Sequence, residues 1–287
     1  MIYLLLSILC STCLFVTFKW YEKFQIDSFQ AIVFNYITAA LCGLIASFAT
    51  FSFSVLIQKT WLWNACVIGA AFIICIYLLS LSIVKIGISI TTVVNKMSVL
   101  VPVLFAFWYY HEIISVFKVV GIGLGILSIY FITYRNESKK IEHKYLYLPI
   151  ALFITGGICD TYIKYTQQTY LSASDHSLFS FVLFSTAAVF GLIIFIIRII
   201  YFKSSLNFKS IIGGILLGIP NYGSIFFLVR ALDNGLGKSA LIFSLNNVGV
   251  VAVSSLLAFM VFKEKFNGLN WLGILISIIS ILFISLS

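Results

Sequence analysis

Charged residues are scarce in this chain. Asp, Glu, Lys and Arg together make up 9% of its 287 residues, whereas 62% are hydrophobic and the mean hydropathy is +1.12. A single water-soluble core of this composition would leave much apolar surface exposed to water. The low charge content therefore excludes a water-soluble globular protein and indicates that lipid is the solvent.

The chain also lacks the strict alternation of apolar and polar residues that is typical of membrane β-strands. Its apolar runs are long and continuous, and a helix needs about 20 mostly apolar residues to cross roughly 30 Å of hydrocarbon. We therefore expect an all-α integral membrane protein with ten transmembrane helices. The predicted spans are residues 2–18, 29–51, 63–83, 88–108, 115–134, 147–166, 177–200, 210–231, 238–261 and 268–286.

The N-terminus lacks the features of a secretory signal peptide. No basic residue precedes the first apolar run, and no small-residue cleavage site follows before Lys19. Signal peptides carry both features, so we expect the first span to be retained. The longest polar connection is Arg135 to Lys144, which is too short to carry an independent function.

All six cysteines fall inside predicted spans. Disulfides and exchange with soluble thiols are not expected there. Cys10 and Cys13 form a CxxC pair on one helical face, but no βαβ pattern or nearby histidine accompanies them, so we interpret them as packing residues. We expect no metal and no cofactor. The cysteines are Cys10, Cys13, Cys42, Cys66, Cys75 and Cys159.

Two stretches of the chain are nearly identical, residues 38–45 (TAALCGLI) and 186–193 (TAAVFGLI), which agree at six of eight positions across a separation of 148. Further matched pairs follow at separations that rise slowly from 145 to 152. Such a pattern indicates a duplication. The matched pairs are Lys19 with Lys164, Gly43 with Gly191, Gly69 with Gly218, Glu112 with Glu264, and Gly121 with Gly273.

An odd number of spans per copy inverts the second copy in the membrane. With five helices in each half, the duplication predicts two inverted-topology repeats related by an axis in the bilayer plane. We predict a first repeat at residues 1–134, a polar linker at 135–146 and a second repeat at 147–287.

Each half ends with a stretch of small residues and Asn, an apolar helix, a Glu and a Gly-containing final helix. With the ten spans and the repeat, this pattern resembles the EamA-like branch of the drug/metabolite transporter superfamily over nearly the full chain. The resemblance implies a carrier, in a bacterial plasma (inner) membrane, whose central cavity is lined by spans 1 to 4 and 6 to 9. The matching residues are Asn95 to Pro102, Glu112 and Gly121-x-Gly123-x-Gly125, then Asn246-Asn247 to Ser254, Glu264 and Gly273.

Lys96 is the charge placed deepest in the predicted membrane. It lies near the middle of the fourth span, beside Asn95, too far from either end for its stem to reach the interface easily. A charge at the centre of a membrane span costs about 2.5–3.5 kcal/mol on insertion scales, so the presence of Lys96 there requires an explanation. We interpret Lys96 as a cationic anchor for a carboxylate or other electron-rich group of a substrate. A structural salt bridge and a misplaced span are the alternatives.

Asp160 is the only carboxylate well inside a predicted span, and Lys164 follows it one helical turn later. This spacing allows an ion pair on one helix face. If transport is coupled to protons, Asp160 is the candidate proton carrier. If Asp160 is permanently paired with Lys164 or Lys96, a facilitator or exchanger is the better interpretation.

Uncharged polar residues supply further hydrogen-bonding groups at membrane depth. Each could serve only in bonding between helices, but together we interpret them as lining a substrate cavity. Pro220 precedes one pair and predicts a kink or hinge there. The candidate substrate-binding residues are Asn95 and Lys96 in span 4, Asn35 and Tyr36 in span 2, Asn221 and Tyr222 in span 8, and Asn246 and Asn247 in span 9.

The remaining charges and glycines have simpler interpretations. Arg230, Asp233, Lys85, Glu112 and Glu264 lie close to predicted span ends, where charges reach the interface at little cost. The GxxxG spacings let helices approach closely, either within a monomer or across a homodimer. They are Gly121 with Gly125 and Gly214 with Gly218.

The reactive groups needed by an intramembrane enzyme are not assembled in this sequence, and we expect no enzymatic activity. His111, His143 and His176 fall at span ends or in loops, and no paired-Asp metal motif is present. Despite a net charge of +9, no Lys/Arg cluster is interleaved with aromatic residues, so nucleic acid is not an expected partner.

The expected partners are a small-molecule substrate and the lipid bilayer. We predict a secondary carrier for small organic solutes such as amino acids, metabolites or drugs, which works by alternating access around a midplane cavity. The alternative is a flippase for a lipid or a lipid-linked sugar on the same fold, which would need a cavity open sideways to the bilayer.

Overall fold

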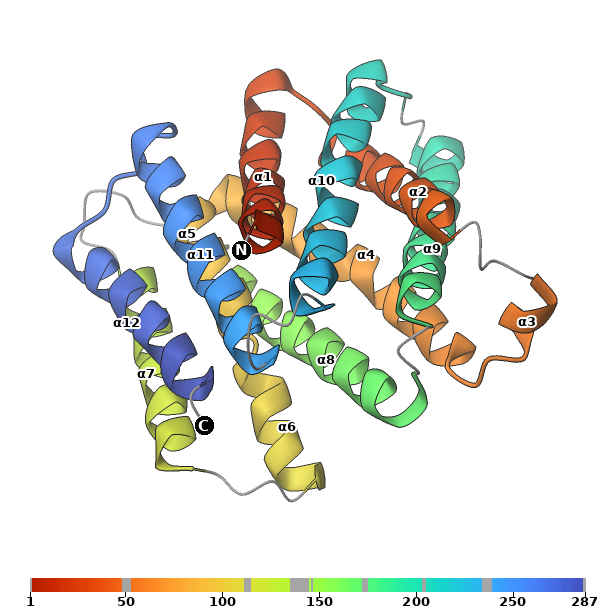
Figure 1. Cartoon of the computed structure of the whole chain (residues 1–287). Coiled ribbons are helices and arrows are strands. Elements are labelled where there is room, and N and C mark those ends of the chain that lie inside the picture. Colours follow the sequence, from red (N-terminus) through yellow and green to blue (C-terminus); the bar gives the residue numbers. More distant parts are fainter. Residues whose placement is uncertain are drawn as a thin grey trace. The chain divides into compact units, whose positions relative to one another are not determined.

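The computed structural model describes residues 2–47, 53–110, 115–134, 145, 147–171, 175–202, 205–233 and 239–285. These residues form helices joined by short connections, with no strand among them, which confirms the predicted all-α class (Figure 1). The helices of the described ranges are α1 (Ile2–Phe24), α2 (Ser28–Ser47), α3 (Phe53–Ile57), α4 (Leu62–Lys85), α5 (Ile88–Met97), α6 (Leu100–Tyr110), α7 (Val116–Thr133), α8 (Tyr147–Tyr170), α9 (His176–Phe202), α10 (Phe208–Asp233), α11 (Ser239–Met260) and α12 (Gly268–Ser285).

Eight helical stretches of the described chain are long and apolar enough to cross a membrane. They are α1, α2, α4, α5 together with α6, α7, α9, α10 and α11. The chain is therefore a multi-pass membrane protein. Every predicted range contains a helix, but α12 is an apolar helix of shorter length, and α8 has the length without the continuous apolar sequence because polar residues such as Asp160, Lys164 and Gln167 interrupt it.

The chain divides into two compact units. The first comprises Met1–Lys19, Leu78–Ile158 and Gly223–Ser287, and the second comprises Trp20–Tyr77 and Cys159–Tyr222. Helices α1, α4, α8 and α10 each begin in one unit and end in the other. The units thus do not follow the predicted halves, because each combines corresponding segments of both. The boundaries at 1–134 and 147–287 remain a prediction about the sequence repeat.

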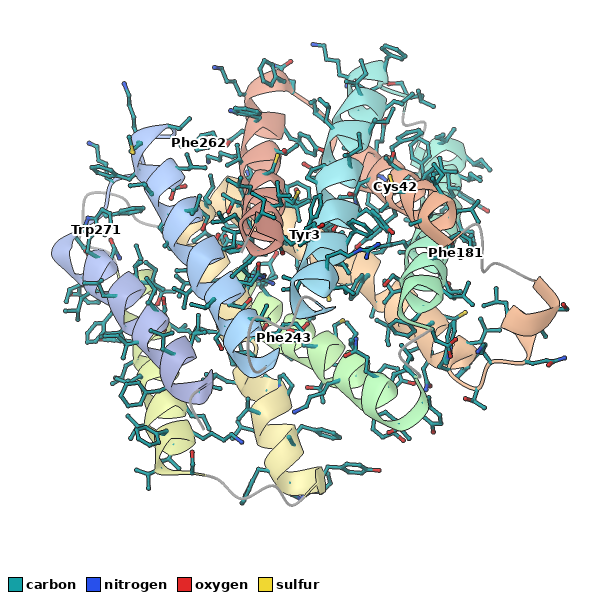
Figure 2. The ribbon with its side chains drawn as sticks, viewed as in Figure 1. Tyr3, Cys42, Phe181, Phe243, Phe262 and Trp271 are labelled. Carbon is teal, nitrogen blue, oxygen red and sulfur yellow. The ribbon has the colours of Figure 1, made fainter. Side chains whose placement is uncertain are left out.

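In the second unit, α2 packs against α9, its counterpart in the predicted repeat (Figure 1). Gly43 on α2 lies against Phe181 on α9, and Gly191 on α9 lies against Val33 on α2. Figure 2 labels one residue on each of these helices, which are Cys42 on α2, the sequence neighbour of Gly43, and Phe181 on α9. Because the early part of each helix meets the late part of the other, α2 and α9 run antiparallel.

In the same unit, a glycine on one helix closely approaches the backbone of another helix at two places. A Cβ added at Gly69 on α4 would lie 2.5 Å from the carbonyl oxygen of Leu183, and one added at Gly218 on α10 would lie 2.7 Å from that of Asn35. Gly69 and Gly218 are a matched pair in the sequence repeat, and Asn35 and Leu183 are 148 positions apart. Corresponding helices therefore make corresponding contacts.

In the first unit, α7 packs against α12, again its counterpart in the repeat (Figure 1). Gly121 on α7 contacts Ile284 on α12, and Gly273 on α12 contacts Ile132 on α7, so these helices are also antiparallel. Ser280 Oγ donates a hydrogen bond of 2.7 Å to the carbonyl oxygen of Gly121. Gly121 of the predicted GxxxG pair thus serves packing within one chain.

An apolar cluster joins α5, α7, α8, α11 and α12 in the first unit. These side chains are buried against one another, and their close packing makes this part of the unit compact. The buried members are Ile86, Ile90, Val93, Val94, Met97, Ile132, Leu148, Leu152, Val251, Ile274 and Ile281.

We expect Gly69→Ala and Gly218→Ala each to lower the free energy of unfolding by about 1–3 kcal/mol, because the added methyl group meets backbone that cannot move aside. The measurement is thermal or denaturant unfolding of the purified protein in detergent. Gly123→Ala is the control, since no described atom outside its own helix lies within 4 Å of an added Cβ there. Equal stability of all three variants would contradict the close approach.

Candidate functional site

The predicted fourth span is interrupted near its middle, between α5 and α6. Pro102 has no backbone N–H, and its ring disfavours a helical carbonyl four residues earlier, at Ser98. That carbonyl instead accepts a hydrogen bond of 3.0 Å from the backbone N–H of Val101, which closes a tighter turn. Ser98 Oγ donates to the carbonyl oxygen of Asn95 at 2.6 Å. Pro102 and Ser98 therefore account for the break locally, whereas α11 contains no proline and is continuous.

Helix α5 carries an opposite charge at each end. Lys96 lies half-buried in its last turn, where the carbonyl groups favour a cation. At the other end, the carboxylate of Glu264 accepts hydrogen bonds from the N–H groups of Ile88 at 2.7 Å and Ser89 at 3.4 Å. Gly87 precedes them with φ +116°, a conformation that favours glycine. The N-terminal N–H groups thus have an acidic partner.

This contact changes the interpretation of Glu264, which the sequence indicated only as a boundary charge. The carboxylate caps α5 from a segment 176 positions away along the chain. Its counterpart in the repeat, Glu112, lies outside the described residues, as do His111 and His143. The spacing of Glu264 from Ile88 carries no local signal, so sequence reasoning could not find the cap.

Two glycines of α8 allow the break to approach that helix closely. A Cβ added at Gly156 would lie 3.3 Å from Ser98 Oγ and 3.8 Å from Asn95 Nδ2. Gly157 lies against Val101, and its added Cβ would also meet the carbonyl oxygen of Ser98 at 3.2 Å. The polar groups of the break therefore lie directly on the backbone of α8 within the first unit.

Helix α11, which packs against α5, adds polar groups to the first unit. Asn246 is buried, Asn247 is half-buried, and no atom of the described chain bonds to Asn246 Oδ1. Thr12 on α1 is also buried, and its hydroxyl is likewise without a partner among the described residues. Buried polar atoms without partners cost about 1–3 kcal/mol each, so they are candidates for binding a ligand or water.

In the second unit, the structure brings together the candidates from the predicted second and eighth spans. Asn221 Nδ2 donates a hydrogen bond of 3.1 Å to Asn35 Oδ1. Asn35 is fully buried, and within the described part of the chain its own Nδ2 finds no acceptor. Tyr36 donates to the carbonyl oxygen of Phe72 at 2.9 Å, and Tyr222 lies beside Gly43. The helix α10 continues through Pro220.

Asp160 and Lys164 lie one turn apart on the part of α8 that belongs to the second unit. Asp160 is exposed rather than enclosed by other side chains, and Lys164 is half-buried. The candidates thus divide between the units. Asn95, Lys96, Asn246 and Asn247 are in the first unit, and Asn35, Tyr36, Asn221, Tyr222, Asp160 and Lys164 are in the second.

Sequence reasoning missed a buried ion pair in the second unit. The carboxylate of Asp175 accepts hydrogen bonds from Lys59 Nζ at 2.8 and 3.1 Å and from Trp61 Nε1 at 3.1 Å. Its side chain is 11% exposed, and that of Lys59 is 29% exposed. The cluster ties the connection before α4 to the start of α9.

Asp27 is the counterpart of Asp175 in the repeat, 148 positions earlier, and it stands before α2 as Asp175 stands before α9. Asp27 Oδ1 accepts a hydrogen bond of 2.9 Å from the N–H of Gln30, which is the bonding pattern of a helix cap. Asp27 Oδ2 lies 3.8 Å from Arg198 Nη2. The shared separation of 148 was the available signal for both residues.

The described residues contain no group of three or more His, Cys, Asp or Glu side chains that could hold a metal ion. Their candidate sites consist of amide, hydroxyl, ammonium and carboxylate groups. Such groups can bind organic solutes by hydrogen bonds and charge.

Comparison with known proteins finds similarity both in sequence and in fold. No protein-family model matches the chain. A crystal structure of another protein is similar to its fold with a TM-score of 0.62 at 16% identity, covering 99% of this chain and 96% of that one. An uncharacterized protein of Haemophilus influenzae (strain ATCC 51907 / DSM 11121 / KW20 / Rd) is 30% identical over 288 residues, which cover 97% of this chain and 95% of the relative. The chain therefore belongs to the same family as that Haemophilus influenzae protein.

Proposed function

We propose that the protein is a secondary carrier of small organic solutes, of the EamA-like type within the drug/metabolite transporter superfamily, in a bacterial inner membrane. The observation that carries the proposal is the antiparallel packing of corresponding helices, α2 with α9 and α7 with α12. An inverted duplication predicts this direction for both pairs. Alternating-access carriers are commonly built from such inverted repeats.

The interrupted span supports the same function. Carriers often form their binding sites from discontinuous helices, whose ends direct partial charges and freed carbonyl groups at the substrate or ion. Here the break at Ser98 lies next to Lys96 and Asn95, and all three are within the span Ile88–Tyr109. Ionisable residues at this depth are costly and mark pathways or binding sites in membrane proteins.

The exposure of Asp160 supports a water-filled space beside α8. A carboxylate facing acyl chains near the middle of a helix that crosses the membrane would be costly. Irregular and polar segments are tolerated at this depth where they line an aqueous cavity. The polar sequence of α8, which includes Thr161, Lys164 and Gln167, fits a cavity wall better than a lipid-facing helix.

The proposal is tested by ligand binding followed by flux. Purified protein is screened for thermal stabilisation by amino acids, organic acids, nucleosides and amphiphilic drugs, because a ligand that binds only the folded state raises the melting temperature. Each stabilising compound is then measured in counterflow with proteoliposomes, and protein-free liposomes provide the background. We expect protein-dependent exchange of at least one stabilising solute. Binding without exchange for every stabilising solute would refute the carrier function.

Proton coupling depends on Asp160. We expect Asp160→Asn to abolish uptake driven by a pH gradient while substrate counterflow persists, because exchange needs no net proton release. Glu22→Gln, which changes an exposed carboxylate near the end of α1, is the matched control and should leave both modes unchanged. Gradient-driven uptake that survives in Asp160→Asn would show that this carboxylate carries no proton.

A further inference from the structure

Two thiols from distant parts of the chain meet in the second unit. Cys75 on α4 and Cys159 on α8 form no disulfide in this structure, and their Sγ atoms are 3.1 Å apart. Cys159 is buried and Cys75 is half-buried. A second contact joins the same helices, because Tyr162 donates a hydrogen bond of 2.8 Å to Asn64 Oδ1. Two side-chain contacts therefore join α4 and α8, and one of them is the contact between the thiols.

We propose that Cys75 and Cys159 are a site of reversible oxidation, at which a disulfide links α4 to α8. Disulfide formation needs side chains that already approach one another, and the Sγ contact of 3.1 Å places these two thiols side by side. Because every cysteine lies in a predicted span, the sequence led us to expect no disulfide. That expectation did not take into account two thiols in direct contact.

The oxidant is a small uncharged two-electron acceptor, of which hydrogen peroxide is the simplest. The sulfur of Cys159 attacks one peroxide oxygen, the O–O bond breaks, and the thiol proton leaves with the departing oxygen as water, which gives a sulfenic acid. The sulfur of Cys75 then attacks the sulfenic sulfur. The S–O bond breaks, and the hydroxyl leaves with the Cys75 proton as a second water, so two electrons pass from the thiols to peroxide.

The thiols of Cys13 and Cys66 have different neighbours. Cys13 Sγ lies 3.8 Å from Thr17 Oγ1 on its own helix, and Cys66 Sγ accepts a hydrogen bond of 3.7 Å from Thr186 Oγ1. A neutral disulfide adds no charge to the membrane interior, so its formation there avoids the cost of a buried charge. Of these thiols, the geometry favours Cys75 and Cys159.

We expect the disulfide to inhibit transport because of where the two cysteines lie, and this expectation rests on the proposed carrier function. Helix α4 leaves the second unit after Tyr77, and α8 enters it at Cys159. Alternating access needs parts of the protein to rock or gate against one another. A covalent link fixes α4 to α8 within the second unit and restrains movement of one helix against the other, so oxidation is expected to inhibit transport and reduction to restore it.

The site is tested on the purified full-length protein. After treatment with hydrogen peroxide, free thiols are alkylated, and a non-reducing tryptic digest is examined by mass spectrometry. We expect the peptides 60–85 and 145–164 to be linked, with a mass lower by two hydrogen atoms than their sum, and to separate on reduction. Peptide 60–85 also contains Cys66, so Cys66→Ser must retain the link, whereas Cys75→Ser and Cys159→Ser must lose it.

Flux through the same preparation tests the consequence. We expect transport by the wild-type protein to fall in proportion to the linked fraction and to recover with dithiothreitol, whereas Cys75→Ser retains transport in peroxide. Absence of the linked peptides overturns the site, and a linked protein with undiminished flux overturns the restraint. If the reduced protein shows no flux, the carrier proposal fails, and the peptide measurement still decides the oxidation site.

Discussion

Replacing Lys96 with alanine is expected to abolish transport and to leave the protein folded and inserted. The ammonium group lies at the end of α5 beside the break in its span, where it can bind an electron-rich group of the substrate. Truncating one partner of a desolvated charged contact costs about 2–5 kcal/mol, so we expect the transport efficiency to fall at least about 30-fold. The measurement is initial-rate flux in proteoliposomes of equal protein content.

The control for Lys96 is Lys265→Ala, which removes an exposed ammonium group from the connection before α12. It changes net charge equally and should leave flux unchanged. Melting temperature and size-exclusion profile establish that both variants are folded. Normal flux through Lys96→Ala would remove this residue from the site, and joint loss of folding and flux would indicate a structural salt bridge instead.

Replacing Asp175 with alanine is expected to cause a large loss of stability. The change leaves Lys59 Nζ and Trp61 Nε1 without their shared acceptor. Breaking a buried ion pair costs about 3–5 kcal/mol; because the Lys59 side chain is 29% exposed and partly rehydrated, we expect about 3 kcal/mol. Denaturant unfolding in detergent measures the change.

The repeat supplies the matched control. Asp27 occupies the corresponding position before α2, but its side chain is 34% exposed, and its partner Arg198 is 37% exposed. Asp27→Ala should therefore cost only about 1 kcal/mol, the value of a helix cap. Equal destabilisation by Asp27→Ala and Asp175→Ala would show that burial of the ion pair does not set its contribution to stability. Asp175→Ala combined with Lys59→Ala should cost less than the sum of the two single changes.

Positions of individual helices were predictable because they depend on local composition. The helix α9 (His176–Phe202) agrees closely with the predicted 177–200, since continuous apolar residues set both its limits. The break near Ser98 was not predicted, although Pro102 supplied a local signal for it. The proline was present in an otherwise apolar run, and the competing hydrogen bond from Ser98 Oγ was visible only in three dimensions.

The sequence predicted the residue types of the candidate site and their depth in the membrane, but it did not predict which of these residues contact one another. Asn35 and Asn221 were both expected to line a cavity, and they form a hydrogen bond with each other. Asp175, Glu264 and the thiol of Cys159 were not recognised. Their partners are distant along the chain, and hydropathy does not identify them, although the separation of 148 from Asp27 was a signal for Asp175 itself.

The sequence by itself determined that this chain is an all-helical, multi-pass membrane protein, because the hydrophobic free energy of each segment is local and nearly additive along the chain. It also contained the matched segments from which a duplication is predicted. Only the tertiary structure decided that α2 meets α9 and α7 meets α12 in antiparallel pairs, and that the compact units combine both halves. The reason is that helix pairing depends on the close fit of particular small and large side chains, which is a property of two surfaces together and not of either sequence alone.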